Sequence, residues 1–237
     1  VVLARNARGA LALLEDGALP VAFVPTIADL EAYVTEEDLL GRRPIQTDET
    51  GIREFIEGKR VLITGAGGSI GSELARQVHR YGPSYLALLD RDESGLHDTQ
   101  LSIDGRGLLS SDDLVLADIR DAERIDEVMQ LVKPDIVFHA AALKHLPLLQ
   151  RYPDEAQKTN VEGTRNVLEA AYRAGVSAFV NISTDKAADP TSVLGETKRM
   201  TEVLTASVPE VPTPFGPSRY LSVRFGNVLG SRGSVLI

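Results

Sequence analysis

Residues 60–71 of the chain read RVLITGAGGSIG, a short apolar run that leads directly into a cluster of glycines. The run at 60–64 shows no alternation of apolar and polar residues, which is typical of a strand buried on both faces of a parallel sheet. A helical pattern begins at residue 69, so the glycines lie between a strand and a helix. A glycine cluster alone is weak evidence, but this context predicts a loop that binds a dinucleotide.

Each glycine of this loop has a different expected task. We expect Gly65 to make the tight turn, Gly68 to let the backbone approach a pyrophosphate, and Gly71 to let the helix pack against the strand. The start of the helix at Ser69 and Ile70 would present unpaired N–H groups to the phosphates. A glycine-rich turn without a ligand is the alternative, which the strand–helix context disfavours.

Beyond this loop, strand-like and helix-like segments alternate along the chain. Further strands are predicted at 85–90, 114–118, 136–140, 178–183 and 221–225, and helices at 69–80, 92–103, 121–132, 154–174 and 195–206. Strict alternation of this kind predicts an α/β fold, a Rossmann-type doubly wound parallel sheet with right-handed crossovers. In such a sheet the ligand binds at the carboxyl ends of the strands.

The first 50 residues differ in texture from the rest, and we expect residues 1–50 to form an N-terminal segment and linker. Short apolar runs there are mixed with glycine and proline up to residue 34, and a polar stretch follows from Thr35 to Thr50. A short helix at 52–56, with Gly58 as its C-cap, would open the catalytic domain at 51–237. Because the chain runs from Val1 to Ile237 without an initial methionine, we expect it to be a fragment of a longer protein.

The composition excludes several classes of function. The 237 residues include 25 Lys and Arg against 34 Asp and Glu, a formal charge of −9, which argues against binding to nucleic acid or to an anionic membrane surface. There is no cysteine, so disulfides, thiolate catalysis and cysteine-based zinc sites are excluded, and we expect no metal site. No apolar stretch reaches the roughly 18 residues that would span a bilayer.

Acidic residues at the ends of the second and third strands are candidates for contacts with the adenosine half of a dinucleotide. Asp90 lies 19 residues after Gly71, where an acid accepts hydrogen bonds from ribose hydroxyls and repels a 2′-phosphate. We therefore expect NAD, with NADP as an alternative because Arg91 could turn toward such a phosphate; Asp90 could instead cap the next helix. Asp118, followed by Ile119, would touch the adenine or begin the helix at 121.

The fourth strand ends in His139-Ala140-Ala141, whose small alanines would let the nicotinamide half lie against the backbone. A histidine that emerges from a buried strand is more often packed and hydrogen-bonded than catalytic, and we expect this of His139. Lys144 follows at the mouth of the crevice and is a candidate contact for a substrate.

The fifth strand delivers Thr184, Asp185 and Lys186 to the same edge of the sheet. An adjacent acid and ammonium group are often no more than a solvated pair, but side chains at this edge face the bound ligand. Lys198 follows in a predicted helix. Asn227 comes after the last strand, where it would bind a sugar diphosphate or stabilise a turn.

Two further polar residues have structural tasks in this interpretation. Arg224, just before Asn227, would hold its neighbours in place. Asn160, inside the long helix predicted at 154–174, would join backbone groups near the active-site strand.

Taken together, the motifs resemble those of the CapD-type polysaccharide biosynthesis proteins, which are inverting UDP-N-acetylglucosamine 4,6-dehydratases of the extended short-chain dehydrogenase/reductase superfamily. The motifs are TGAGGSIG (64–71), LLDRDE (88–93), HAAALKHLPL (139–148), KTNVEGTRNVLEAA (158–171), STDKAADPTSVLGETKRMTE (183–202) and RFGNVLGSRGSV (224–235). The resemblance covers about residues 35–237. It implies a substrate domain that lies largely after the last motif and is therefore truncated, and residues 1–34 as the tail of an upstream membrane-anchored region.

The resemblance also implies a chemistry. NAD takes a hydride from C4 of the sugar, a base removes the proton at C5, an acid helps to expel the C6 hydroxyl, and the hydride returns to C6. By resemblance, Lys186 is the base, Asp185 the acid, Thr184 binds the C4 oxygen and Lys198 binds the nicotinamide ribose. These roles require two pKa shifts: burial must raise the pKa of Asp185, and desolvation and nearby cations must lower the pKa of Lys186. The environment must therefore keep the two residues from resting as an ion pair.

Leu194 departs from the shorter members of this family. They carry a tyrosine four residues before the lysine that corresponds to Lys198, and a leucine cannot transfer a proton. The acceptor of the C4 hydroxyl proton is left open between Lys186, Asp185 and a water ordered by Thr184 and Lys198. Two other functions also stay open: a UDP-sugar epimerase, and a dinucleotide-binding module that does not catalyse.

The resemblance also implies an oligomeric state, a substrate and a cellular location. The resemblance implies a homo-oligomer that takes a UDP-sugar as substrate in surface polysaccharide or capsule biosynthesis. It would act in the cytoplasm, at the cytoplasmic face of the membrane if the full-length protein is anchored there. We expect neither nucleic acid nor direct membrane contact for this fragment.

Overall fold

The computed structural model describes residues 2–4, 21–23, 47–105 and 113–228. The chain divides into two units, Val1–Asp48 and Glu49–Ile237, with the division two residues before the predicted boundary. In the first unit, β1 (Val2–Ala4) and β2 (Val21–Phe23) pair in parallel. The rest of the predicted linker, up to residue 46, and residues 229–235 of the last motif lie outside the described residues.

Six parallel strands form the sheet of the second unit. They are β3 (Arg60–Thr64), β4 (Tyr85–Asp90), β5 (Leu114–Leu116), β6 (Ile136–His139), β7 (Ala178–Thr184) and β10 (Arg219–Phe225). Their spatial order is β10-β7-β6-β3-β4-β5, the 3-2-1-4-5-6 order of a dinucleotide-binding doubly wound sheet when read from β5. The predicted fold class is confirmed, and the strand order reverses between β3 and β6.

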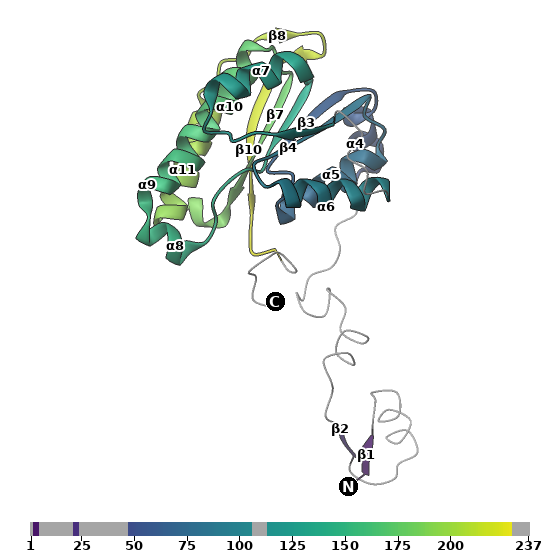
Figure 1. Ribbon diagram of the computed structural model, residues 1–237, viewed down its shortest axis with the longest axis vertical. Helices are drawn as coiled ribbons and strands as arrows, with labels where there is room; N and C mark the ends of the chain where they lie inside the picture. Colours follow the sequence, from purple (N-terminus) through teal and green to yellow (C-terminus); the bar gives the residue numbers. More distant parts are fainter. Residues whose placement is uncertain (1, 5–20, 24–46, 106–112, 229–237) are drawn as a thin grey trace. The chain divides into compact units, whose positions relative to one another are not determined.

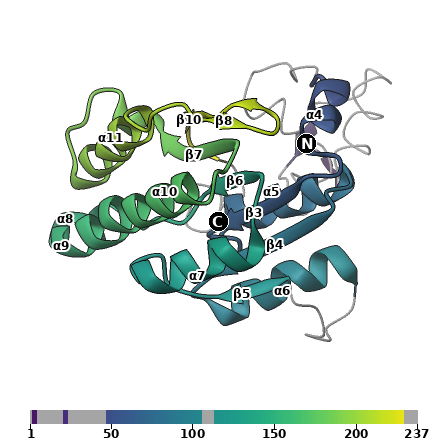
Figure 2. The same ribbon diagram turned by 90° about the horizontal axis from the view of Figure 1, so that it is seen from above.

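Helices cover both faces of this sheet (Figures 1 and 2). One face carries α4 (Glu49–Ile56), α5 (Ser69–Arg80) and α6 (Glu93–Asp104), and the other carries α7 (Ala122–Val132), α10 (Gly163–Arg173) and α11 (Val193–Ala206). Neighbouring residues of a strand point to opposite faces. Ile63 therefore belongs to the apolar core beneath α5, and Leu62 to the core beneath α7 and α10.

The helix predicted at 154–174 is instead the last three of four consecutive segments that span residues 146–173. They are α8 (Leu146–Arg151), α9 (Pro153–Ala156), a π-helical segment (Gln157–Glu162) and α10. Prolines occupy the first turns of α8 and α9, where a missing N–H costs nothing, so the sequence itself marks both starts. A short hairpin of β8 (Pro212–Thr213) and β9 (Gly216–Pro217) before β10 was also not predicted.

Candidate cofactor and active site

Two of the three predicted glycines are required by the protein's own backbone. Gly65 has φ +71°, and a Cβ there would lie 2.5 Å from the amide nitrogen of Ala141 at the end of β6. A Cβ on Gly71 would overlap the carbonyl oxygen of Gly65. Gly65 therefore makes the turn, and Gly71 lets α5 pack against it, as the sequence predicts.

Gly68 is less constrained than the other two, because a Cβ there would make one tight contact rather than an overlap. A Cβ there would meet only the carbonyl oxygen of Gly65, at 3.2 Å. Gly68 is also the N-cap of α5 and has no side chain with which to bond the first-turn N–H groups. A backbone without a side chain at a helix N-terminus suits a phosphate group. Ser69 and Ile70 form the first positions of this helix, as predicted.

A second pair of glycines holds the loop from the other side and was not predicted. A Cβ on Gly95, in the first turn of α6, would lie 2.9 Å from the Cα of Gly67. The amide of Gly67 donates a hydrogen bond to Asp90 Oδ2 at 2.9 Å. The end of β4 and the start of α6 therefore fix the loop.

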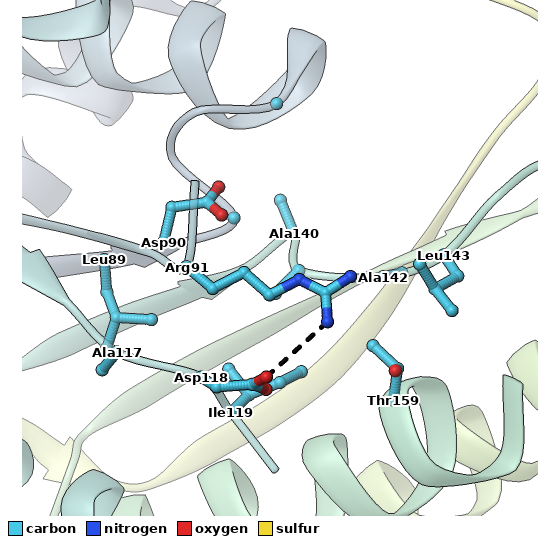
Figure 3. Close-up of a pocket in the computed structure, with 13 residues that line it drawn as sticks. Leu89, Asp90, Arg91, Ala117, Asp118, Ile119, Ala140, Ala142, Leu143 and Thr159 are labelled. Atoms are coloured by element: carbon cyan, nitrogen blue, oxygen red, sulfur yellow. Dashed lines mark ion pairs between the residues drawn. The ribbon is translucent and has the colours of Figure 1, made fainter. Parts of the chain in front are cut away.

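A pocket of about 120 Å³ opens where β3, β4, β5 and β6 end (Figure 3). Eight residues predicted to bind the cofactor line it: Gly65, Gly68, Asp90, Arg91, Asp118, Ile119, Ala140 and Ala141. Segments that lie far apart in the sequence thus meet at the point where the strand order reverses, which is where doubly wound sheets bind ligands.

The acidic residues of the pocket are held by neighbouring groups. Asp90 accepts hydrogen bonds from the amides of Gly67 and Asp92, and Asp92 rather than Asp90 caps α6. Asp118 pairs with Arg120 at 2.6 Å and with Arg91 at 3.6 Å, as the dashed line in Figure 3 shows for Arg91. Burial raises the pKa of Asp118, but the hydrogen bonds and charge of Arg120 outweigh it and leave that pKa below its usual value.

Thr159 is a pocket residue that the sequence did not reveal. It lies in the π-helical segment, lines the pocket opposite Ala140 and is 5% exposed (Figure 3). Its hydroxyl oxygen is buried and has no hydrogen-bond partner. An unpaired buried polar atom is rare, and π-helical turns occur often at functional sites. The regular helical pattern predicted for this stretch gave no signal for it.

Asn160, next to Thr159, has the structural role predicted for it. Its Oδ1 accepts a hydrogen bond from the amide of Leu143, and its Nδ2 donates to the carbonyl of Leu143 and to Thr197 Oγ1. The residue is fully buried. It therefore ties the loop after β6 to the π-helical segment and to α11.

Thr184, Asp185 and Lys186 lie together at the carboxyl end of β7. Lys186 Nζ is 3.0 Å from Asp185 Oδ1, and it donates a second hydrogen bond to Asn227 Oδ1 at 3.2 Å. The expectation that burial raises the pKa of Asp185 is wrong: the Asp185 side chain is 58% exposed, and the hydrogen bonds from Lys186 and Thr184 lower its pKa. The resting state is an ion pair.

Lys198 lies deeper, on α11. It is 7% exposed, and its Nζ donates to the carbonyl of Ile182 at 2.8 Å. Burial lowers the pKa of Lys198 to about 8, while the charge of Glu202 opposes the shift. Its amine is thus partly neutral in the mildly alkaline range.

His139 is a structural residue, as predicted. It is fully buried, and its two ring nitrogens lie 2.7 Å from Thr64 Oγ1 and 2.9 Å from Thr164 Oγ1. Burial, with a smaller contribution from the charge of Lys198, lowers the pKa of His139 to about 3. The ring is therefore neutral at physiological pH.

Leu194 packs among apolar side chains. It is 6% exposed and packs in a cluster with Leu149 of α8 and Ala156 of α9. Lys144, by contrast, is exposed in the loop after β6 and does not line the pocket.

Glu202 is a second residue that the sequence did not reveal. Its side chain is 9% exposed and carries a charge in the interior, one turn after Lys198. Hydrogen bonds from Arg224, opposed by burial and supported by Ser183 and Arg199, lower the pKa of Glu202 to about 2. The sequence did contain a signal for Glu202: an acid on the buried face of a predicted helix, followed on the next strand by Arg224.

A sequence profile described as "Polysaccharide biosynthesis protein" matches residues 61–237, which include the loop, the pocket and the Asp185–Lys186 pair. The chain belongs to this polysaccharide biosynthesis family. The chain is 44% identical over 204 residues to the probable polysaccharide biosynthesis protein EpsC of Bacillus subtilis, covering 86% of this chain and 33% of EpsC. It is 36% identical to an inverting UDP-N-acetylglucosamine 4,6-dehydratase of Campylobacter jejuni, covering 77% of this chain and 53% of the enzyme.

One similar solved structure contains bound NAD. A UDP-glucose 4-epimerase from Stenotrophomonas maltophila, with bound NAD and formylated UDP-arabinopyranose, is 29% identical with a TM-score of 0.55. The match covers 62% of this chain and 48% of the epimerase. The chain thus spans between one third and about half of the length of these relatives. Within the part of this chain that the structure describes, no helix is long and apolar enough to cross a membrane.

Proposed function

We propose that the protein containing this chain is a nucleotide-sugar 4,6-dehydratase that acts on UDP-N-acetylglucosamine in surface polysaccharide biosynthesis. The Asp185–Lys186 pair carries the proposal: it directly follows β7, the neighbour of β6, and the residues after β6 line the pocket. Elimination of water needs both an acid and a base, and this pair can supply both. Likeness to the Campylobacter jejuni dehydratase supports the choice of sugar.

NAD is the cofactor in this proposal, and the residues that line the pocket suit its adenosine and pyrophosphate groups. The backbone at Gly68 and the N-terminus of α5 would hold the pyrophosphate, and Asp90 would accept hydrogen bonds from the adenosine ribose. The orphaned hydroxyl of Thr159 offers a further polar contact. When bound, NAD supplies a reversible hydride acceptor, so that the sugar is oxidised at C4 and later reduced at C6.

The resting ion pair has the wrong protonation for both proposed roles. A bound sugar would exclude water from Asp185 and Lys186, and desolvation disfavours both charges. A proton can then pass from Lys186 Nζ to Asp185 Oδ1 along their 3.0 Å hydrogen bond. Neutral Lys186 takes the C5 proton, and protonated Asp185 gives its proton to the departing C6 hydroxyl, which leaves as water. These two transfers restore the charges of the ion pair. Once C6 has been reduced, protonated Lys186 would return its proton to C5, and the proton taken earlier from the C4 hydroxyl would then pass back to Lys186 and restore the resting state.

Three neighbouring groups orient the reacting atoms. Thr184 Oγ1, which donates to Asp185 Oδ1 at 2.9 Å, would turn to the C4 oxygen of the sugar. Asn227 holds the Lys186 ammonium from the other side, and Lys198 would bind the nicotinamide ribose. Leu194 carries no proton, so the acceptor of the C4 hydroxyl proton is Lys186, Asp185 or a water held by Thr184 and Lys198.

A UDP-sugar epimerase is the second candidate, favoured by the likeness to the Stenotrophomonas maltophila enzyme. Incubation of the full-length protein with NAD and UDP-N-acetylglucosamine separates the possibilities. A 4-keto-6-deoxy product supports dehydration, and a C4 epimer supports epimerisation. Bound NAD without turnover supports a non-catalytic module, a reading that Leu194 keeps open. The predicted homo-oligomer is a separate proposal, which sedimentation of the full-length protein tests.

A further inference from the structure

Glu202 joins three elements that carry the proposed catalytic groups. From α11, its carboxylate accepts hydrogen bonds from Ser183 Oγ on β7 at 2.7 Å and from Arg224 Nε and Nη2 on β10, both at 2.7 Å. Arg199 of α11 adds a contact at 3.2 Å. Ser183 and Arg224 are direct neighbours in the β7–β10 register, so one carboxylate binds adjacent strands at the same level.

This level lies immediately before the active-site residues of both strands. Ser183 precedes Thr184, Asp185 and Lys186 along the chain, and Arg224 lies three residues before Asn227. Lys186 and Asn227 then meet in a hydrogen bond of 3.2 Å. The position of that contact therefore depends on how the two strand ends are held relative to each other.

Apolar packing holds the start of the last strand, where Tyr220 stacks on Phe179 of β7, but it weakens toward the active-site end. β10 is an edge strand, and its Leu221 and Val223 are 45% and 39% exposed. Polar contacts hold it to α11 and β7 at two levels. Two residues before Ser183, Asn181 Nδ2 donates to Thr201 Oγ1 and to Ser222 Oγ. The second level is the Glu202 cluster, which is charged and lies closer to the active site.

We propose that Glu202 is a positioning residue: its buried carboxylate fixes the ends of β7 and β10 against α11 and so sets the relative positions of Lys186 and Asn227. The strand alignment follows from the contacts above, and its importance for turnover rests on the proposed function. Glu202 does not reach the cofactor pocket, so its effect should be confined to the catalytic half of the site.

The test is Glu202→Gln in the full-length protein, which keeps the side-chain volume but leaves Arg224 without its counter-charge. Displacement of a catalytic group by about 1 Å can cost up to ~100-fold in rate. We expect kcat with UDP-N-acetylglucosamine to fall by about tenfold or more, while the Kd for NAD stays within about twofold of wild type. An unchanged kcat per folded molecule would show that Glu202 only stabilises the fold and would overturn the proposal.

Two further variants serve as controls for this experiment. Ser183→Ala removes one hydrogen bond and no charge, so it should give a smaller loss of kcat in the same direction even if Glu202→Gln folds poorly. Asp126→Asn breaks another two-contact arginine pair, with Arg173, between α7 and α10. It should leave kcat unchanged.

Amide hydrogen exchange separates this proposal from the proposed function. If the wild-type protein does not convert the sugar, the proposed function fails, but Glu202→Gln should still speed exchange in 183–187 and 221–227. Asp126→Asn should not do so. Unchanged exchange in those two segments would refute the positioning role whatever the substrate is.

Discussion

Replacement of Thr159 by valine should stabilise the NAD-free protein and weaken its binding of NAD. Valine has the shape of threonine without the hydroxyl, and this hydroxyl is buried and unpaired. A buried polar group without a partner costs about 1–3 kcal/mol. Thr159→Val should therefore raise the free energy of unfolding of the NAD-free protein by about 1 kcal/mol or more.

The same change should weaken NAD binding. If rotation about χ1 turns the Thr159 hydroxyl to the cofactor, the lost neutral hydrogen bond is worth about 0.5–1.5 kcal/mol. That energy corresponds to an increase of about two- to twelvefold in Kd. Calorimetry gives the Kd, and urea unfolding without NAD gives the stability.

Thr205→Val is the matched control. Thr205 is also buried in a helix, at 1% exposed, but its hydroxyl donates to the carbonyl of Thr201 at 2.7 Å. This variant should lose about 1 kcal/mol of stability and keep its NAD affinity. A Thr159→Val protein that behaves like this control, less stable but unchanged toward NAD, would refute the argument that the hydroxyl serves the cofactor.

Three other changes test separate parts of the site. Lys186→Ala should abolish dehydration while calorimetry still detects NAD, and retained turnover would remove Lys186 from the mechanism. Asp90→Asn should weaken NAD and strengthen NADP, each by about tenfold, because the charge that accepts from ribose and repels a 2′-phosphate is lost; an unchanged ratio of the two Kd values would argue against this role. Because the pKa of His139 falls from 6.5 to about 3 on folding, the unfolded chain binds the extra proton, so stability should drop as the pH falls between these values, by up to ~1.4 kcal/mol per unit. His139→Gln should reduce that slope in acid unfolding curves.

The cofactor half of the site could be predicted from the sequence because its requirements are local. Gly65 is required by its positive φ, and Gly71 by its contact with the carbonyl of Gly65 six residues earlier, so their spacing carries the information; the contact of Gly65 with Ala141 after β6 could not be read from it. Asp90 ends a strand that can be recognised from its apolar residues. Thr159 could not be found in this way, because the apolar pattern predicted one regular helix where the chain forms a π-helical segment.

The catalytic half of the site depends on contacts that the spacing of residues along the sequence does not reveal. Asp185 and Lys186 were identified as a pair, but their protonation depends on exposure, which only the folded chain sets. The role of Glu202 needs Arg224, 22 residues away, and the lateral pairing of β7 with β10. A buried acid on a helix is a usable signal only when the strand that brings its partner is known.

The two halves of the crevice are therefore built on different physical principles. Around the glycine loop, positions are fixed by close backbone packing, which leaves little room for movement. At the ends of β7 and β10, a charged cluster and an exposed ion pair fix the positions instead. Such polar contacts weaken when water is admitted and strengthen when a ligand excludes it. A sugar that closes over Asp185 and Lys186 would thus tighten the catalytic half only when substrate is present, while the cofactor half stays preformed.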